Sequence, residues 1–228
     1  MQDRLTHVRR GIRDTLPLYV PVLPFALVFG IVVNQSGLPQ LLGWSTSPII
    51  FGGAAQMTLL TLLGEGASLA AAVSATLIVG ARHLLYSVTL APRFRGQPRW
   101  FRWLGSYVLI DQVFALSVLR KELDADAFRA YYLAAGFSFW FLWLLSTMAG
   151  IFIGPLVPES WGLAFAAPVL FVGLMVATID RWEKVAAAMI AALITGLLAG
   201  LPNKTGLLVG ALLGVAFGVL LEQKARRR

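Results

Sequence analysis

The sequence contains no cysteine and only two histidines. Without cysteine the chain cannot form disulfides, thiolate metal sites or a cysteine nucleophile. Charge is also scarce, because charged residues make up 13% of the chain and hydrophobic residues 58%. An ordinary soluble domain carries about 25% charged residues. This composition excludes a soluble globular domain.

Long uncharged stretches account for the imbalance, and they cover 15–64, 130–158, 160–179, 185–203 and 205–221. A membrane-spanning helix needs about 20 apolar residues to cross a hydrocarbon core of about 30 Å. We therefore predict an all-α, polytopic integral membrane protein, a helical bundle of seven or eight transmembrane segments. The expected segments are 16–35, 44–63, 66–91, 102–119, 130–153, 163–179, 185–201 and 205–221.

The charged residues lie mainly at the ends of the chain and between these segments. In residues 1–14, arginines alternate with apolar residues at three- and four-residue spacing, which is typical of an amphipathic helix on the cytoplasmic membrane surface. Residues 15–221 form one transmembrane domain, and 222–228 form a basic tail. The net charge of +8 therefore indicates orientation signals and contacts with anionic membrane lipids, and not a nucleic-acid partner.

The distribution of basic residues predicts that both termini lie in the cytoplasm. With eight crossings, 13 Lys and Arg lie on the cytoplasmic side, five lie outside, and Arg82 lies within a span. The arginine-rich loop 92–102 conflicts with this arrangement, because it falls on the outer side. An even number of crossings before the loop would return it to the cytoplasm, and would make 44–63 a broken or re-entrant segment.

Two ionised side chains, Arg82 and Asp111, fall well inside the predicted spans. An ionised group near the bilayer centre costs at least about 2.5–3.5 kcal/mol on insertion scales and commonly serves a site. Arg82 lies ten residues before loop 92–102 and Asp111 nine residues after it, so two adjacent helices would bring them to equal depth. They are predicted to be partners, either as two poles of a binding site or as a structural pair that fixes helix register.

Two polar stripes surround Arg82. Helical spacing stacks Tyr86 beside Arg82, and Ser87 beside His83. His83 is the only histidine within the predicted spans. It is either a proton relay, since an imidazole titrates at about pH 6.5, or a neutral side chain bonded to the helix backbone. Asp111 and His83 are therefore the candidates for proton coupling.

Two consecutive glycines, Gly52 and Gly53, interrupt segment 44–63, and Gln56 follows them. Each glycine lowers helix stability by about 1 kcal/mol relative to alanine, and admits unwound backbone or very close packing. A helix broken here would offer N–H groups to an anionic substrate group and carbonyls to a cation. The alternative is a plain packing notch.

The final segment carries a ridge of glycines four residues apart, formed by Gly206, Gly210, Gly214 and Gly218. Such a face lets another helix approach closely. We expect it to serve packing, against a helix of this chain or of another subunit.

Four motifs stand in a fixed order along the chain: Gly53-Ala54-Ala55-Gln56, Arg82-His83-Leu84-Leu85-Tyr86, Leu109 to Ala115 around Asp111, and Leu163 to Phe171. In order and spacing they resemble the AzlC-type branched-chain amino-acid permease family, the larger subunit of bacterial branched-chain amino-acid exporters. The resemblance covers roughly residues 15–220. It implies an exporter of the bacterial cytoplasmic (inner) membrane, working with a small hydrophobic AzlD-type partner subunit.

The sequence therefore predicts a multi-pass permease that exports branched-chain or similar small neutral amino acids, driven by the proton gradient. The predicted substrate site comprises Gly52, Gly53, Gln56, Arg82, Tyr86 and Asp111. Asp111 and the Gln56 carbonyl would take the ammonium group of a zwitterion. Arg82 and the N–H groups freed at the glycine pair would take its carboxylate.

A rival interpretation is a non-transporting membrane scaffold or assembly subunit, in which Arg82 and Asp111 form a structural pair. We do not expect an enzyme. One intramembrane histidine, no cysteine and no glutamate–histidine metal pattern within the spans leave little catalytic chemistry. No metal and no cofactor are expected.

Overall fold

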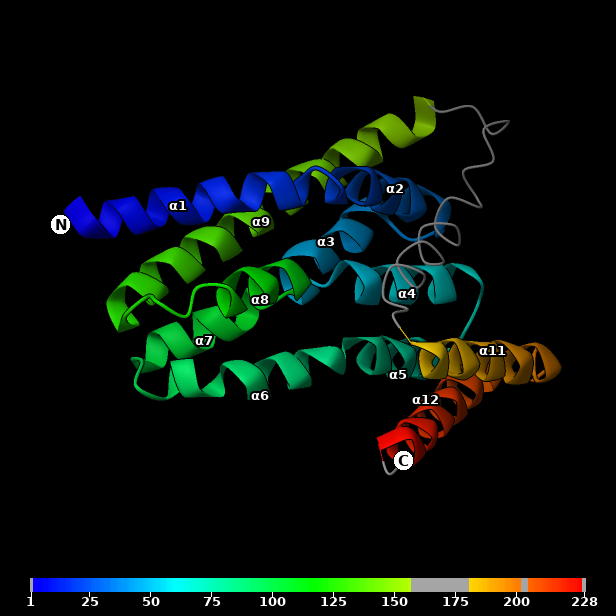
Figure 1. The fold of residues 1–228 in the computed structure, drawn as a ribbon. Helices are drawn as coiled ribbons and strands as arrows, with labels where there is room; N and C mark the ends of the chain where they lie inside the picture. Colours follow the sequence, from blue (N-terminus) through cyan, green and yellow to red (C-terminus); the bar gives the residue numbers. More distant parts are fainter. Residues whose placement is uncertain (1, 157–180, 202–204, 227–228) are drawn as a thin grey trace.

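The computed structural model describes residues 2–156, 181–201 and 205–226, and within these ranges the chain is helical and has no strand. The helices, shown in Figure 1, are α1 (Gln2–Tyr19), α2 (Val22–Gln35), α3 (Gln40–Ile50), α4 (Gly53–Gly64), α5 (Leu69–Gly80), α6 (Arg82–Arg95), α7 (Arg99–Tyr107), α8 (Asp111–Val118), α9 (Ala125–Ile153), the short 3-10 helix η1 (Gly154–Leu156), α11 (Trp182–Leu197) and α12 (Thr205–Arg226). The predicted segment 163–179 and the motif at 163–171 lie outside the described residues.

The long helix α9 is the element against which much of the described bundle packs. It begins after Asp124, whose side chain accepts hydrogen bonds from the N–H groups of Asp126 and Ala127 and so caps the helix. Its 29 residues span about 44 Å. Small residues bring α2 very close to it, since a Cβ on Gly30 would lie 2.5 Å from the backbone of Gly150.

Helices α1 and α2 form one path along α9 that is bent by 68°. Pro21 lies at the bend, and proline interrupts helical hydrogen bonding because it has no N–H. The Tyr19 hydroxyl donates to Ser146 Oγ at 2.9 Å. Further along, Asn34 donates to the carbonyl of Ile151 at 2.7 Å. The path therefore runs from the beginning of α9 to its end.

The first fourteen residues belong to this path, because α1 continues without a break to Tyr19. Asp14 accepts hydrogen bonds from Arg120 at 2.6 Å and from the Tyr131 hydroxyl at 2.8 Å. The hydrogen bond with Asp14 raises the pKa of Arg120 above its ordinary value, so the pair stays charged. The placement of residues 1–14 in the membrane surface stays a prediction.

Helices α3 and α4 form a hairpin of about half the length of the bundle, which we call the first hairpin. The sequence predicts either a full crossing or a broken or re-entrant segment over 44–63. The chain breaks at Phe51, which is left-handed with φ of 44°. The first hairpin starts beside α2, to which Gln40 donates a hydrogen bond. It also returns there, because a Cβ on Gly64 would lie 3.1 Å from Ser36.

Helices α7 and α8 form the second hairpin, so 102–119 is not the single crossing helix that the sequence predicts. Along α7, Gly105 accepts a hydrogen bond from the Tyr132 hydroxyl at 2.8 Å, and Tyr107 accepts one from Trp140 at 2.6 Å. α7 therefore follows α9 toward its middle. After a non-helical turn, α8 runs back toward the start of α9. Apolar composition alone could not show where this segment breaks.

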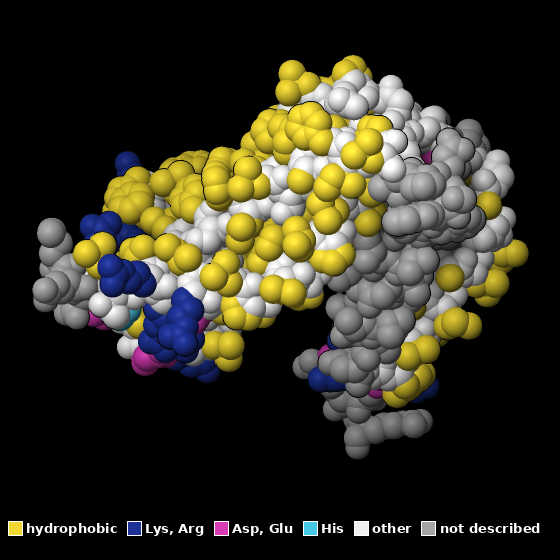
Figure 2. Space-filling view, turned by 90° about the horizontal axis from the view of Figure 1, so that it is seen from above, with side chains coloured by type: hydrophobic (Ala, Val, Ile, Leu, Met, Phe, Trp, Pro, Cys, Tyr) yellow, Lys and Arg dark blue, Asp and Glu magenta, His cyan; other side chains and the backbone are white. Residues whose placement is uncertain are grey.

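The turns before α7 and before α9 lie together at one end of the bundle, which we call the basic end. Arg93, near the end of α6, donates to the carbonyl of Arg120 at 3.2 Å and of Leu123 at 2.8 Å. The Gln97 side chain donates to the carbonyl of Ala125 at 2.8 Å. Helix α1 starts at the same end (Figure 1), and Figure 2 shows Lys and Arg side chains gathered there.

This arrangement resolves the conflict over loop 92–102. The loop shares an end of the bundle with 120–129 and the start of α1, so the eight-crossing arrangement that separates them is wrong. Two full-length paths, α1–α2 and α5–α6, precede the loop. With two crossings before it, the loop lies on the same side as the start of the chain. Segment 44–63 turns back, as the alternative arrangement requires.

The two hairpins give the bundle the arrangement of an inverted repeat. In the first unit, the path α1–α2 runs away from the basic end, and the first hairpin enters from the opposite end. In the second unit, the path α5–α6 runs toward the basic end, and the second hairpin enters from there. Many transporter folds contain two units related in this way.

Among the described residues, two helices are long and apolar enough to cross a membrane, Leu69–Arg95 and Ala125–Leu156, and the bent path α1–α2 raises the number to three. The predicted count of seven or eight crossings is therefore not confirmed. The hairpins explain part of the difference, because segments 44–63 and 102–119 are each counted as a crossing in the prediction, and each folds back as a hairpin.

The predicted glycine ridge is confirmed as a packing surface. A Cβ on Gly214 would lie 2.6 Å from the Cβ of Ala191, and one on Gly218 would lie 2.9 Å from the Cβ of Ala187. Both alanines belong to α11. The helix that packs on the ridge therefore belongs to this chain.

The shared basic end predicts the labelling of single cysteines, for which the cysteine-free chain gives a clean background. Gly96→Cys and Lys121→Cys should react with an impermeant thiol reagent from the same side of the membrane. Glu65→Cys, at the turn between α4 and α5, should react only from the other side. Labelling of positions 96 and 121 from opposite sides would contradict the fold.

Candidate functional site

An ion pair lies where α5 gives way to α6 and α7 gives way to α8. Arg82 Nη1 is 3.1 Å from Asp111 Oδ2, and each side chain is 38% exposed. Tyr86, one turn after Arg82, donates its hydroxyl to Asp111 Oδ1 at 2.8 Å. The structure confirms that Arg82 and Asp111 are partners, and it brings Tyr86 to the same carboxylate.

Both charged residues stand at the first position of a helix. Arg82 follows Ala81, whose N–H makes a tight bond to the carbonyl three residues back, at 3.1 Å. Asp111 follows the extended residue Ile110. The positive end of a helix favours an anion and disfavours a cation. Asp111 is thus stabilised by α8 as well as by its partners. Helix α6 continues α5 across the single turn at Ala81, since Leu69–Arg95 forms one helix of 27 residues, so Arg82 does not lie at a free helix end.

Arg82 also keeps one unused hydrogen-bond donor. Its Nε–H is buried and has no partner within the described part of the chain. A buried donor without an acceptor costs about 1–3 kcal/mol. An acceptor oxygen supplied by a ligand or by water would remove this cost, so the guanidinium has capacity for a second anion.

Aromatic rings line one side of the pair. The ring of Tyr86 stacks on Phe114 with centroids 4.3 Å apart, and His83 lies edge-on to Tyr86 at 5.8 Å. His83 Nδ1 is 2.8 Å from the carbonyl of Gly80. A carbonyl only accepts, so Nδ1 carries a proton. The backbone bond expected of a structural histidine is therefore present, and a role of His83 in proton coupling stays a prediction.

The break of the first hairpin is held by Gln56, whose side chain is fully buried. Its Oε1 accepts from the N–H of Gly52 at 3.1 Å. Its Nε2 donates to the hydroxyls of Thr46 and Ser47, each at 3.1 Å. In this structure the Gly52 N–H and the Gln56 carbonyl, both predicted to contact substrate, satisfy each other.

The same break frees the carbonyl of Pro48, which the N–H of Gly52 would reach in an unbroken helix. The Tyr107 hydroxyl, from the second hairpin, donates to this carbonyl. Tyr107 in turn accepts from Trp140 at 2.6 Å, and its ring lies 6.1 Å from that of Phe51. The tips of the two hairpins thus meet beside the middle of α9.

The predicted site residues fall into two groups: Gly52, Gly53 and Gln56 at the tip of the first hairpin, and Arg82, Tyr86 and Asp111 beside the second. No hydrogen bond joins the two groups within the residues that the structure describes. They are linked through Tyr107, which contacts the first tip and stands four residues before Asp111.

Gly53 is closely packed, as expected if the glycine pair serves as a packing notch. A Cβ at this position would lie 2.7 Å from the ring of Phe25 and 2.8 Å from that of Trp143. Close packing and an exposed N–H are compatible, because Gly53 is also the first residue of α4. The binding of substrate by Gly53 stays a prediction.

Three residues that hold the hairpin tips were not identified from the sequence: Thr46, Ser47 and Tyr107. The available signal was the run of three hydroxyl residues, Ser45 to Ser47, followed by Pro48 inside an apolar segment. For metal binding, the described ranges contain no group of three or more His, Cys, Asp or Glu side chains that could hold an ion.

The chain is similar to several known membrane proteins. The family model described as "AzlC protein" matches residues 17–157, which include both hairpins and the ion pair. The Escherichia coli "Inner membrane protein YgaZ" is 27% identical over 189 residues, covering 79% of this chain and 77% of that protein. The Bacillus subtilis "Branched-chain amino acid transport protein AzlC" is 23% identical over 173 residues, covering 75% of this chain and 66% of that protein.

A Helicobacter pylori protein named "Uncharacterized membrane protein" is 24% identical over 201 residues, covering 83% of this chain and 86% of that protein. No solved structure matches the chain. The matching family range ends at residue 157, so it falls within the part of the chain formed by the two units and α9.

The bonds of Gln56 predict the stability of a variant. Gln56→Leu nearly keeps the side-chain volume but leaves the Gly52 N–H without its acceptor, and removes the bonds that the Thr46 and Ser47 hydroxyls accept. We expect it to lower the free energy of unfolding by about 2–4 kcal/mol, measured by denaturant titration in detergent micelles. Gln35→Leu is the matched control at an exposed position, expected within about 0.5 kcal/mol of the parent. Equal losses in the two variants would contradict the role of Gln56.

Proposed function

Because this chain belongs to the AzlC family, we propose that it is the large subunit of a permease that exports branched-chain or similar small neutral amino acids. The family and its membrane-protein relatives support a role in transport across a membrane rather than in catalysis. The Bacillus subtilis relative is named for branched-chain amino acid transport, and this name supports the substrate class. Export and proton coupling are parts of the proposal that rest on the family resemblance.

The observation that carries the proposal is the Arg82–Asp111 pair beside the meeting hairpin tips. A zwitterionic amino acid carries one charge of each sign on neighbouring atoms. Its ammonium group would replace Arg82 at Asp111, and its carboxylate would replace Asp111 at Arg82. The unused Nε–H of Arg82 supplies a second donor for that carboxylate. Two directed donors on one guanidinium suit a planar carboxylate.

The pair can be reached from outside the bundle. Each side chain is 38% exposed, so a substrate can contact both charges. A substrate that replaces both contacts at once leaves neither charge without a partner. Tyr86 would keep its hydrogen bond to Asp111 while the ion pair opens. Its stacking on Phe114 provides an apolar surface for the substrate side chain.

The tip of the first hairpin would contribute to substrate binding as well. The N–H groups at the start of α4 stand at the positive end of that helix, and this supports a role for Gly53 in holding a carboxylate. Gln56 would have to release Gly52 before either group could contact substrate, because they bond each other in this structure. A state with substrate bound therefore requires a rearrangement at this tip.

The inverted units support an alternating-access mechanism. One unit would rock against the other around the hairpin tips, opening the pair first to one side and then to the other. The basic end would face the cytoplasm, since Lys and Arg are retained there. Asp111 is the proposed proton carrier, because it is the carboxylate of the proposed site and its charged partner changes as substrate binds and leaves, and His83 is the second candidate.

Two further elements of the proposal come from the family resemblance. We propose that the protein is a multi-pass component of the bacterial inner membrane, and the name of the Escherichia coli relative supports this location. We also propose that it works with a small hydrophobic AzlD-type partner. The rival function, a non-transporting scaffold, is favoured by one observation, the direct contact between Arg82 and Asp111.

Efflux of preloaded amino acids distinguishes the two functions, with the small partner co-expressed. Asp111→Asn and Arg82→Gln each remove one charged contact with substrate. We expect branched-chain amino-acid efflux to fall by about ten- to a hundred-fold, equivalent to a charged hydrogen bond of about 1.5–3 kcal/mol. Asp126→Asn is the matched control, because its exposed side chain pairs only with Arg129 at the surface.

Membrane insertion of each variant is checked by its abundance in the membrane fraction. Unchanged efflux in both Asp111→Asn and Arg82→Gln would overturn the assignment of the site. Absence of efflux of every loaded amino acid by the unaltered protein would overturn the permease and favour the scaffold.

A further inference from the structure

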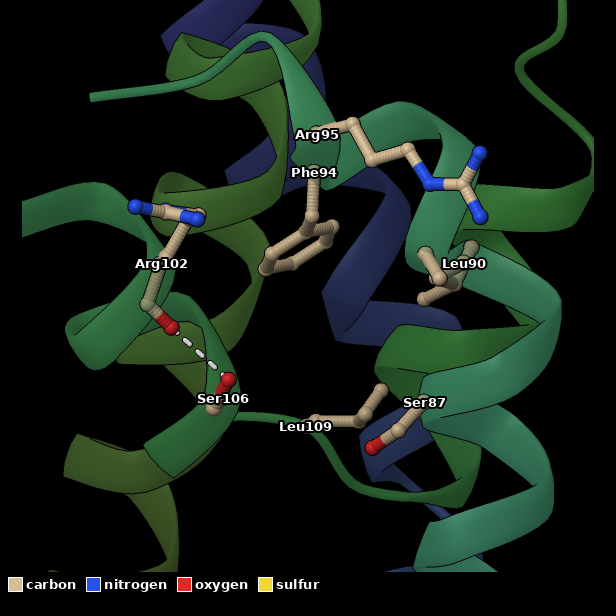
Figure 3. Close-up of a pocket in the computed structure, with 8 residues that line it drawn as sticks. Ser87, Leu90, Phe94, Arg95, Arg102, Ser106 and Leu109 are labelled. Atoms are coloured by element: carbon tan, nitrogen blue, oxygen red, sulfur yellow. Dashed lines mark hydrogen bonds between the residues drawn. The ribbon is translucent and has the colours of Figure 1, made fainter. Parts of the chain in front are cut away.

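A pocket lies between α6 and α7. Its volume is about 250 Å³. It is lined by Ser87, Leu90, Ala91, Phe94, Arg95, Arg102, Ser106 and Leu109. In Figure 3 the Phe94 ring lies between Arg102 and Leu90, and the Arg95 side chain extends away from Arg102. Neither Arg82 nor Asp111 lines it, so it is a separate feature of the second unit.

The pocket combines an apolar floor with positive charge at one end. Leu90 and Leu109 are buried, and with Phe94 they form the floor. Arg95 and Arg102 stand on either side of Phe94 in Figure 3, one from each helix. Such a combination fits a ligand with an anionic head and a hydrocarbon body.

The charges of these two arginines are not used elsewhere in the described part of the chain. Neither side chain makes an ion pair or a hydrogen bond there, and both are exposed. Arg93, in the same stretch, is fully engaged, because it donates to three carbonyls and stacks over Phe128 at 4.2 Å. The difference between Arg93 and its two neighbours therefore marks Arg95 and Arg102 as available for an external anion.

The surface around the pocket is one that acyl chains would cover. Leu84, Leu85 and Val88 on α6 are 69%, 70% and 74% exposed. On α7, Trp103 is 80% exposed and Trp100 is 48% exposed. Tryptophans at this position are typical of the level of lipid head groups. The arginine end of the pocket thus lies at head-group depth and the leucine floor lies deeper.

We propose that this pocket is a binding site for an anionic glycerophospholipid of the membrane. The phosphate lies between Arg95 and Arg102, where two guanidinium groups from different helices satisfy its oxygens. One acyl chain runs over Leu90 and Leu109, and the other lies along the exposed leucines of α6. The lipid therefore ties α6 to α7 at the basic end.

A membrane lipid fits better than a free phosphate ion. A free ion would make no contact with the floor of Leu90, Phe94 and Leu109. The acyl chain of a bound lipid fills the space above the floor and packs against it. The floor thus selects for a phosphate that carries acyl chains.

Native mass spectrometry of the purified protein tests the site. The protein is titrated with dioleoyl phosphatidylglycerol, with dioleoylglycerol as the matched lipid without phosphate, and with inorganic phosphate as competitor. We expect one tightly bound phosphatidylglycerol, no comparable binding of dioleoylglycerol, and no displacement by inorganic phosphate. Binding of dioleoylglycerol with equal affinity, or displacement by phosphate, would overturn the proposal.

Variants distinguish the pocket from a diffuse positive field. Arg95→Gln and Arg102→Gln should each weaken phosphatidylglycerol binding about five-fold, the equivalent of about 1 kcal/mol for each arginine. Arg99→Gln removes an exposed charge from the same loop outside the pocket lining, and should change binding by less than about two-fold. Equal weakening by Arg99→Gln would overturn the proposal.

Filling the pocket gives a test that retains both charges. Ala91→Trp places a large ring between the two helices, and it should abolish the tight phosphatidylglycerol complex while Arg95 and Arg102 remain. Thermal unfolding in detergent verifies that each variant is folded. A folded Ala91→Trp protein that binds the lipid as tightly as its parent would contradict the assignment.

Discussion

Polar backbone groups freed at a helix break must find partners inside the protein, because hydrocarbon offers none. This constraint governs the centre of the bundle. The helix break between α3 and α4 frees the N–H of Gly52 and the carbonyl of Pro48. Gln56 accepts from the N–H, and Tyr107 donates to the carbonyl. Because Tyr107 belongs to the second hairpin, the repair of one break joins the two units. The meeting of the hairpin tips thus follows from hydrogen-bond satisfaction rather than from apolar packing alone.

The charged pair follows from the same geometry. Helices that begin midway along the bundle present positive ends there, and Asp111 at the start of α8 is a natural occupant of such a position. Arg82 lies within the nearly continuous helix α5–α6, and its charge is compensated by the carboxylate of Asp111. The pair is therefore mutually dependent and partly exposed. A dipolar solute can substitute for both interactions at once, and this makes the pair suitable for transport.

Sequence reasoning predicted the helical class and the partnership of Arg82 and Asp111, and it offered the break within 44–63 as one of two alternatives, since each depends on composition or local spacing. It placed loop 92–102 on the wrong side in its eight-crossing arrangement, because a count of apolar segments cannot distinguish a crossing from a hairpin. No glycine pair precedes Asp111, so the sequence gives no local signal for the turn between α7 and α8. The roles of Tyr107 and Thr46 depend on contacts between residues far apart in the chain, which no local pattern reveals.

The central claim is that the Arg82–Asp111 pair opens to hold both ends of a zwitterion, and equilibrium binding tests it most directly. The purified protein would be titrated with leucine, with 3-methylbutylamine, which lacks the carboxylate, and with 4-methylpentanoate, which lacks the amine. The account predicts saturable binding of leucine and binding of each fragment weaker by at least about ten-fold, since each forfeits a charged contact of about 1.5–3 kcal/mol. A fragment that binds as tightly as leucine would contradict it.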